Sequence, residues 1–122
     1  MFSVDFYRRP DGKAPVEEFL DGLNTKMRNK ALDSLLLLEK FGNALREPHS
    51  KPMGNGIFEL RIKFSSDISR IFYFFFADNK IILTNGFIKK TQKTPKSQLE
   101  LAKKYKADYE KRMDSKEVNQ NE

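Results

Sequence analysis

Hydrophobic and polar residues alternate along the first residues of the chain. Phe2, Val4 and Phe6 are separated by more polar side chains, and this two-residue period is typical of a strand with one buried face. The segment 8–12, Arg-Arg-Pro-Asp-Gly, interrupts the alternation with residues that favour turns. The chain is therefore expected to open with a strand and a turn.

A helical period replaces the alternation after this turn. Apolar residues and a proline in the first turn predict a short helix from Pro15 to about Gly22. A second helix follows, capped by Asn24 or Thr25, with apolar residues at intervals of three or four until Gly42 ends it. The two helices should form a helical hairpin.

The middle of the chain predicts a loop followed by three strands. Residues 43–55 contain prolines and few apolar side chains, which indicates a loop. Residues 58–64 alternate between apolar and charged side chains, and the almost wholly apolar 71–77 suit a central strand that is covered on both faces. The last strand is expected over 81–88. A short polar turn at 65–69 and another before the last strand make an antiparallel meander.

The last part of the chain predicts one more helix. A Thr-Pro pair at 94–95 can start it, and apolar residues recur at helical spacing from Leu99 to Tyr109. The polar segment 113–122 is expected to fray or to be disordered, which leaves residues 1–112 as a single domain. The resulting order, βααβββα, is typical of an α+β fold in which an antiparallel sheet is packed by the N-terminal helical hairpin and the C-terminal helix.

Composition narrows the chemistry that the chain can support. Its 122 residues can bury a real hydrophobic core, and no cysteine is present for thiol catalysis, thiolate metal sites or disulfides. The single histidine, His49, excludes two-histidine acid–base catalysis within one chain, and its place in the predicted loop favours a solvated side chain over a general base. No apolar run approaches the roughly 20 residues of a membrane span, and no secretory signal is visible. We therefore expect a soluble cytoplasmic protein without membrane contact.

Positive charge is concentrated near the C-terminus. The chain carries 23 basic and 17 acidic side chains, a formal net charge of +6. Residues 89–112 hold nine basic and three acidic side chains, so this segment alone has the net charge of the whole chain. A polyanion should be attracted there first, although surface lysines can also serve only to keep a helix in solution.

Basic side chains on the predicted strands are candidate phosphate contacts. Arg61 and Lys63 share a strand face, and Arg70 opens the next strand, so Lys63 and Arg70 are expected to be close across the turn. Such cations can stabilise the crowded phosphate that forms when RNA is cut by attack of its own 2′-hydroxyl. The base for the hydroxyl proton is open between Glu59, on the same face, and a lysine whose pKa is depressed by neighbouring cations.

Further candidates lie on the later strands. Lys89, Lys90 and Lys93 end the last strand, and the strand register decides whether they join the arginines. The Tyr73 ring could stack on a base, although burial in the core is the more common fate of such a ring. Surface salt bridging is the alternative role for the charged residues, since a polar strand face needs solvated side chains.

Three short motifs follow one another in the second half of the chain. They are Gly-Ile-Phe-Glu-Leu-Arg at 56–61, Arg-Ile-Phe-Tyr at 70–73 and Gly-Phe-Ile-Lys-Lys-Thr-Gln-Lys-Thr-Pro at 86–95. Each motif is weak alone, but their order and spacing, followed by a helix that starts at Thr-Pro, are specific. Together they resemble the RelE/HigB-type toxins of toxin–antitoxin systems, in particular the phage-derived HigB-like branch.

This resemblance implies a RelE-like fold and a toxin that enters the ribosomal A site and cuts mRNA during translation, thereby arresting growth. The chain would be an endoribonuclease, an mRNA interferase, without a metal or other cofactor, because the motif cations themselves would neutralise the phosphate. The resemblance also implies a cognate antitoxin, in this branch usually a helix-turn-helix protein similar to HigA. Operator DNA would be bound only through the toxin–antitoxin complex.

The matching motif positions also imply which residues form the site. The implied catalytic residues are Arg61, Arg70, Lys89 and Glu59. The implied contacts to RNA or the ribosome are Lys63, Lys90, Lys93 and Tyr73. Glu59 stands where a lysine is often found in the best-known RelE pattern, so the identities of the general base and acid stay open.

A second class of function remains as an alternative. Because the sequence offers no clear acid–base pair, the chain can also be interpreted as a non-catalytic RNA- or protein-binding regulatory module of the same fold. Such a module would bind RNA with a steep salt dependence, as phosphate contacts demand, but would cut no transcript.

Overall fold

A five-stranded sheet with the order β1-β5-β4-β3-β2 forms the centre of the fold. The computed structural model describes residues 1–89 and 94–121. The strands are β1 (Ser3–Phe6), β2 (Ser50–Gly54), β3 (Ile57–Phe64), β4 (Asp67–Phe76) and β5 (Lys80–Lys89). β3, β4 and β5 form the predicted antiparallel meander, β2 pairs antiparallel with β3, and β1 pairs parallel with β5.

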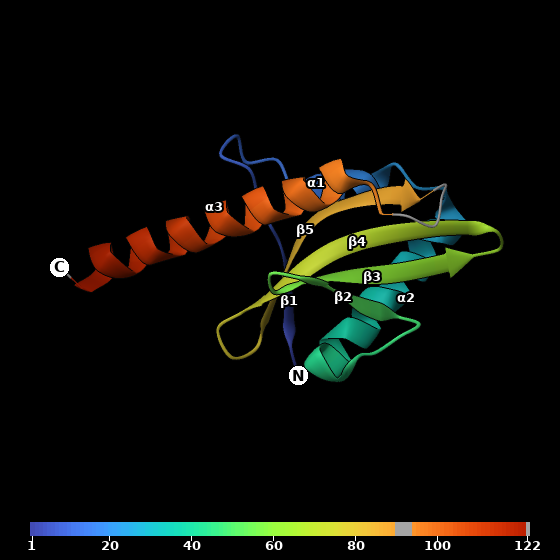
Figure 1. Ribbon diagram of the computed structural model, residues 1–122, viewed down its shortest axis with the longest axis horizontal. Coiled ribbons are helices and arrows are strands. Elements are labelled where there is room, and N and C mark those ends of the chain that lie inside the picture. The colour runs from blue at the N-terminus through green and yellow to red at the C-terminus, as the bar shows by residue number, and fades with distance from the viewer. Residues whose placement is uncertain (90–93, 122) are drawn as a thin grey trace.

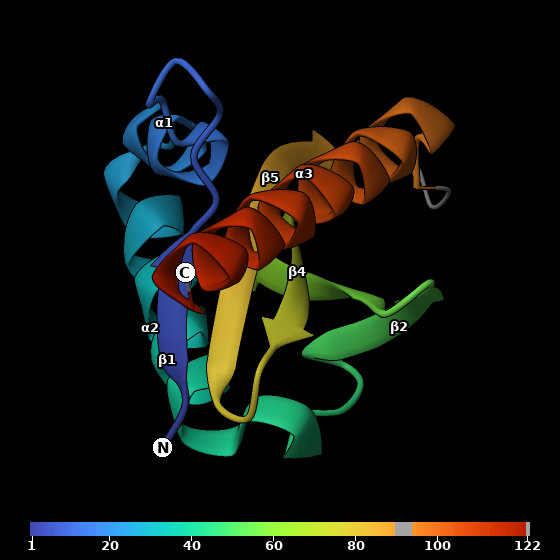
Figure 2. The same ribbon diagram turned by 90° about the vertical axis from the view of Figure 1, so that its left-hand side faces the viewer.

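The helices lie on opposite faces of this sheet (Figures 1 and 2). α1 (Pro15–Asp21) and α2 (Thr25–Phe41) pack on one face, and α3 (Lys96–Asn121) crosses the other. A short 3-10 helix, η1 (Gly42–Ala44), follows α2. The predicted α+β arrangement, with the helical hairpin and the C-terminal helix packed on the sheet, is confirmed. Among the described residues, no helix combines the length and the apolar character needed to cross a lipid bilayer.

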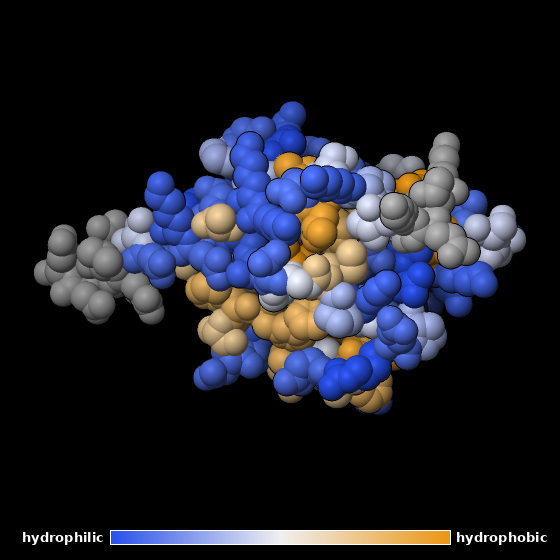
Figure 3. Space-filling model, in the orientation of Figure 1, coloured by the Kyte–Doolittle hydropathy of each residue, from blue (hydrophilic) through white to orange (hydrophobic). Residues whose placement is uncertain are grey.

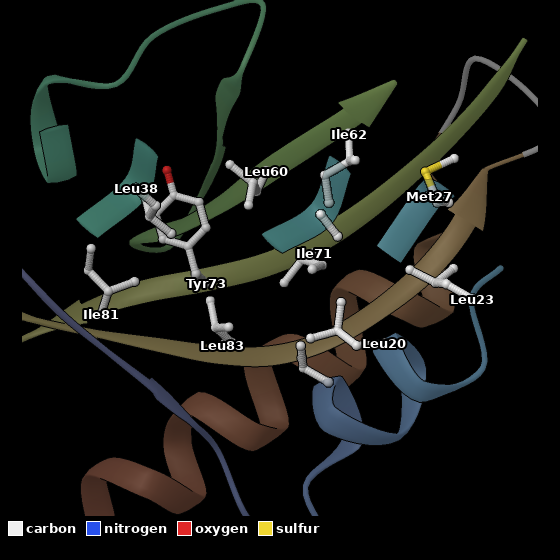
Figure 4. Packing of buried hydrophobic residues seen from close by; sticks show 12 residues of the cluster. Leu20, Leu23, Met27, Leu38, Leu60, Ile62, Ile71, Tyr73, Ile81 and Leu83 are labelled. Carbon is white, nitrogen blue, oxygen red and sulfur yellow. The ribbon is translucent and has the colours of Figure 1, made fainter. Parts of the chain in front are cut away.

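The main core fills the space between the sheet and the α1–α2 hairpin (Figure 4). On the strands, alternate residues such as Leu60, Ile62 and Ile71 point to this side, as the two-residue period predicts. From α2, Met27 and Leu38 meet them, and both are almost completely buried. Each such side chain contributes roughly 1.5–3 kcal/mol relative to leaving it exposed, so this layer fixes the sheet against the hairpin.

A smaller core lies under α3. Tyr105 of α3 stacks on Tyr7, which follows β1, at 4.5 Å between ring centroids. The Tyr7 hydroxyl donates a 2.6 Å hydrogen bond to Asp108, and burial raises the pKa of Tyr7 to about 12, with that carboxylate adding to the effect. Figure 3 shows hydrophilic side chains over α3 and apolar surface over the strands below it. α3 therefore covers only part of its face of the sheet.

The segment predicted as a loop, 43–55, contains η1 and β2, so the predicted loop is wrong in part. β2 carries Pro52 and Gly54, which disfavour strands, and a single large apolar side chain, Met53. It is a strand because it pairs with β3, and a proline is tolerated there because β2 lies at the edge of the sheet.

The turn between β3 and β4 is shorter than the predicted 65–69. Phe64 pairs with Asp67, and Ser65 has φ +57°, so the connection is a tight turn of two residues. Asp67 and Ser69 belong to β4 although they are polar. The register consequently places Arg70 opposite Arg61, and the predicted neighbour, Lys63, lies opposite Ile68.

The C-terminal helix is longer than the hydrophobic pattern indicates. α3 extends to Asn121, so the backbone is helical through residues that the sequence predicted to fray or be disordered from position 113. Adding a residue to an existing helix is much easier than starting a helix, which lets α3 continue where no apolar pattern marks it.

Candidate functional site

A buried ion pair joins β3 and β4 on the face that α3 crosses. Glu59 and Arg70 are 1% and 2% exposed, and Arg70 Nη1 donates to Glu59 Oε1 at 2.8 Å. Thr94, which precedes α3, donates to the second carboxylate oxygen at 2.9 Å. The carboxylate is thus hydrogen-bonded at both oxygens, as a buried charge requires.

This environment also sets the electrostatics of Arg70. Burial lowers the pKa of its guanidinium from the ordinary value, the charge of Glu59 opposes that shift, and the charge of Arg61 adds to it. In the described part of the chain, Arg70 Nε has no hydrogen-bond partner. Glu59 is therefore the group that makes a buried guanidinium tolerable at this position.

Arg61 is the accessible member of the cluster. Its side chain is 34% exposed, and its Nε lies 4.0 Å from Glu59 Oε1. The register places it directly opposite Arg70, so two guanidinium groups share one carboxylate. The group of three carries an excess of one positive charge, and the exposed Arg61 presents that charge to an anion.

A second row of basic positions lies two residues farther along the strands. Lys63 pairs with Ile68, and Ile68 pairs with Lys89, so both lysines occupy one row across three strands. Because neighbouring strands are about 4.8 Å apart, the backbone positions of the two lysines are separated by roughly 10 Å. This row is two residues along the strands from the row of Arg61 and Arg70, so the backbone of Lys89 lies near the arginines but not beside them. The predicted contacts Lys90 and Lys93 lie outside the described residues.

Tyr73 lies on the other face of the sheet. It is 1% exposed, stacks on Phe58 at 5.5 Å between centroids, and its hydroxyl is hydrogen-bonded to Ser50. Burial raises the pKa of Tyr73. This position corrects the expectation that Tyr73 contacts RNA, because the ring has no exposed surface on which a base could stack.

The structure also corrects the expectation that Glu59 lies on a solvated strand face. The alternation of β3 places Glu59, Arg61 and Lys63 on one face, as predicted, but Glu59 is buried there and bonded to Arg70 and Thr94. The sequence indicates Thr94 only as the start of a helix. No local signal reveals its role, because it lies 35 residues from Glu59 in the chain.

The arrangement suits the binding of a phosphate. A guanidinium offers several N–H donors in a planar fork that matches two phosphate oxygens, and a fixed neighbouring pair holds the strand positions in register. Among the described residues, no group of three or more histidine, aspartate or glutamate side chains is placed to hold a metal ion.

Comparisons with known proteins identify the family of the chain. None of the curated proteins compared with the chain matches it. The model of the family described as phage derived protein Gp49-like (DUF891) matches residues 18–107, which are 90 of the 122 residues. The match includes Glu59, Arg61, Arg70 and Thr94. The chain therefore belongs to the phage-derived Gp49-like family (DUF891), a RelE-like family associated with toxin–antitoxin systems.

Proposed function

We propose that the chain is the toxin of a toxin–antitoxin pair, of the HigB-like kind, and that it cuts mRNA on translating ribosomes. The toxin role is supported by the family. The chemistry is supported by one observation, the partly exposed Arg61 beside the buried Glu59–Arg70 pair. The partners of such a toxin are the ribosomal A site, in the cytoplasm, and a helix-turn-helix antitoxin, and the pair binds operator DNA as a complex.

In the proposed reaction, the 2′-oxygen of one nucleotide forms a bond to the adjacent phosphorus and the bond from phosphorus to the 5′-oxygen breaks. The 2′-hydroxyl loses its proton, and the departing oxygen gains one. Arg61 binds the phosphate oxygens, where charge accumulates in the transition state. Glu59 and Arg70 act as positioning residues that hold Arg61, and Lys63 and Lys89 contact the flanking phosphates.

Primer extension on a defined mRNA tests this proposal. The purified chain is incubated with the mRNA, with and without programmed ribosomes, beside Arg61→Ala and the control Lys13→Ala. Lys13 is exposed and lies outside the candidate site. We expect cuts only with ribosomes, a loss of about 100-fold or more in Arg61→Ala, as for removal of one transition-state donor, and no loss in the control.

Two results would contradict the proposal in different ways. If Arg61→Ala cuts as well as the unchanged chain, the assignment of the site is wrong. If the folded, unchanged chain cuts nothing on ribosomes, the enzymatic function is wrong. The non-catalytic binding module would then replace it, which one observation favours: both oxygens of the Glu59 carboxylate are already occupied by Arg70 and Thr94.

A further inference from the structure

A cavity of about 490 Å³ lies at the edge of the sheet, between α2 and β3. Lys30 and Leu37 of α2 form one wall, Ile62 and Lys63 of β3 form the other, and His49, from the segment before β2, also lines the cavity. The cavity exists because β2 pairs with β3 only as far as Leu60, which leaves the rest of β3 without a strand on that side among the described residues. Its volume lies within the range of roughly 300–1,000 Å³ that is usual for ligand sites.

The walls of this cavity carry an excess of positive charge. Lys30, Arg61 and Lys63 contribute three permanent cations, against one carboxylate, Asp33. In the part of the chain that the structure describes, neither Lys30 nor Lys63 forms an ion pair within 4.0 Å. Lysines gathered around a cavity and left without acidic partners attract an anion.

The rest of the lining is mixed, because it combines aliphatic side chains and Pro48 with the polar Ser34 and His49. Leu37, Ile62 and Ile68 contribute aliphatic side chains from both walls. A cavity lined by both aliphatic and basic side chains suits a ligand with a flat apolar part and a phosphate, as in one unit of a nucleic acid strand. An inorganic anion alone would leave the aliphatic part unused.

The backbone of β3 adds a donor at the same edge. The Arg61 N–H points outward and donates to the His49 carbonyl oxygen at 2.8 Å. Alternate residues of a strand direct their N–H groups to the same side, so the Lys63 N–H also points to this edge, beyond the last residue that β2 pairs. A phosphate in the cavity can therefore meet a main-chain donor in addition to the lysines.

Arg61 connects this cavity to the candidate site, because it borders the cavity and also lies beside the Glu59–Arg70 pair. We propose that the cavity binds one nucleotide of a single-stranded RNA, adjacent to the phosphate that Arg61 holds. The inference rests on the proposed function in taking RNA as the ligand. It assigns a binding role to Lys30 and His49, which no motif of the sequence indicates.

Fluorescence anisotropy with a labelled single-stranded RNA of roughly ten nucleotides, fully 2′-O-methylated, tests the inference. The methyl groups block attack by the 2′-oxygen, so binding is measured without cleavage. The variants are Lys30→Gln and His49→Gln. The matched control is Lys26→Gln, which makes the same charge change one turn earlier on α2 at an exposed residue that does not line the cavity.

We expect Lys30→Gln to weaken binding about threefold to tenfold near 0.1 M salt and to reduce the salt slope by about 0.7, the value for one contact to single-stranded nucleic acid. His49→Gln should weaken binding, and Lys26→Gln should not. Equal losses in Lys30→Gln and Lys26→Gln would overturn the inference, because they would reflect the charge of the helix in general. Unchanged binding in both cavity variants would also overturn it.

These experiments distinguish failure of the proposed function from failure of the cavity assignment. If the unchanged chain fails to cut mRNA on ribosomes but loses RNA affinity in Lys30→Gln alone, the proposed function is wrong and the cavity assignment stands. If the unchanged chain cuts mRNA and Lys30→Gln binds RNA normally, the proposed function stands and the cavity assignment is wrong. If Lys30→Gln weakens binding to the antitoxin and leaves RNA binding unchanged, the occupant is a protein and the inference is wrong.

Discussion

Two arginines that the sequence presents as equivalent differ in the structure. Arg61 is 34% exposed, whereas Arg70 is buried against Glu59. We expect Arg70→Ala to lower the free energy of unfolding by about 3–5 kcal/mol, since it leaves a buried carboxylate without its partner. Arg61→Ala should lower it by less than about 1 kcal/mol. Urea denaturation measures both.

A double variant separates the charge effect from packing. Glu59→Leu with Arg70→Met replaces the pair by apolar side chains, which should recover most of the stability lost in Arg70→Ala. If Arg70→Ala is as stable as the unchanged chain, the pair does not carry the structural role assigned to it. Arg70→Ala is consequently a poor test of catalysis, and Arg61→Ala is the informative one.

Tyr7 makes the free energy of unfolding depend on pH in the alkaline range. Its pKa is raised to about 12 by burial and by Asp108, above the value of about 10 in an unfolded chain. The neutral phenol is therefore favoured in the folded state, and this stabilisation is complete below about pH 10 and lost as pH rises toward 12. Tyr7→Phe should remove that part of the alkaline loss, and it should cost about 1 kcal/mol at neutral pH for the lost hydrogen bond. Denaturation of both chains from pH 8 to pH 12 would show parallel curves if Tyr7 has no such role.

At the scale of the elements, α2 depends on the residue that precedes it. The Asn24 side chain accepts a 2.8 Å hydrogen bond from the Met27 N–H, so Asn24 is the cap, of the two candidates that the sequence offers. Asn24→Ala should lower the free energy of unfolding by about 1 kcal/mol. Asn29→Ala, the same change at an exposed residue inside the helix, should be neutral or slightly stabilising. Equal destabilisation by both changes would argue against the cap.

The elements also show why sequence patterns succeed or fail. β1 and β3 alternate and α1 and α2 have helical periods, so local order carries enough information to predict them. β5 is instead buried on both faces from Ile81 to Asn85, and its apolar run marks it. β2 has no such pattern. Its five residues include Pro52 and Gly54, and they form a strand because the edge of β3 lies beside them. Pairing between distant segments is absent from any local window of the sequence.

At the scale of the whole molecule, the candidate site is where separate segments meet. The shared face of Glu59 and Arg61 follows from the alternation of β3, as predicted, whereas the place of Arg70 opposite Arg61 follows from the strand register. The burial of Glu59 and Arg70 is not predicted, because it depends on their pairing across two strands and on Thr94, which reaches Glu59 through the tertiary fold. The cavity depends in the same way on α2, β3 and the segment before β2. The strand face of a residue on an alternating strand can thus be predicted from the sequence, but the solvent accessibility of its side chain cannot.

Growth of cells tests whether the whole molecule acts as the proposed toxin. Induced expression of the chain should arrest growth, and co-expression of its cognate antitoxin should restore growth. Arg61→Ala, at the same protein level, should permit growth while still binding the antitoxin, because the change removes an exposed side chain that the fold does not need. Lys13→Ala should arrest growth like the unchanged chain. If Arg61→Ala arrests growth as strongly as the unchanged chain, toxicity does not depend on the phosphate contact assigned to Arg61.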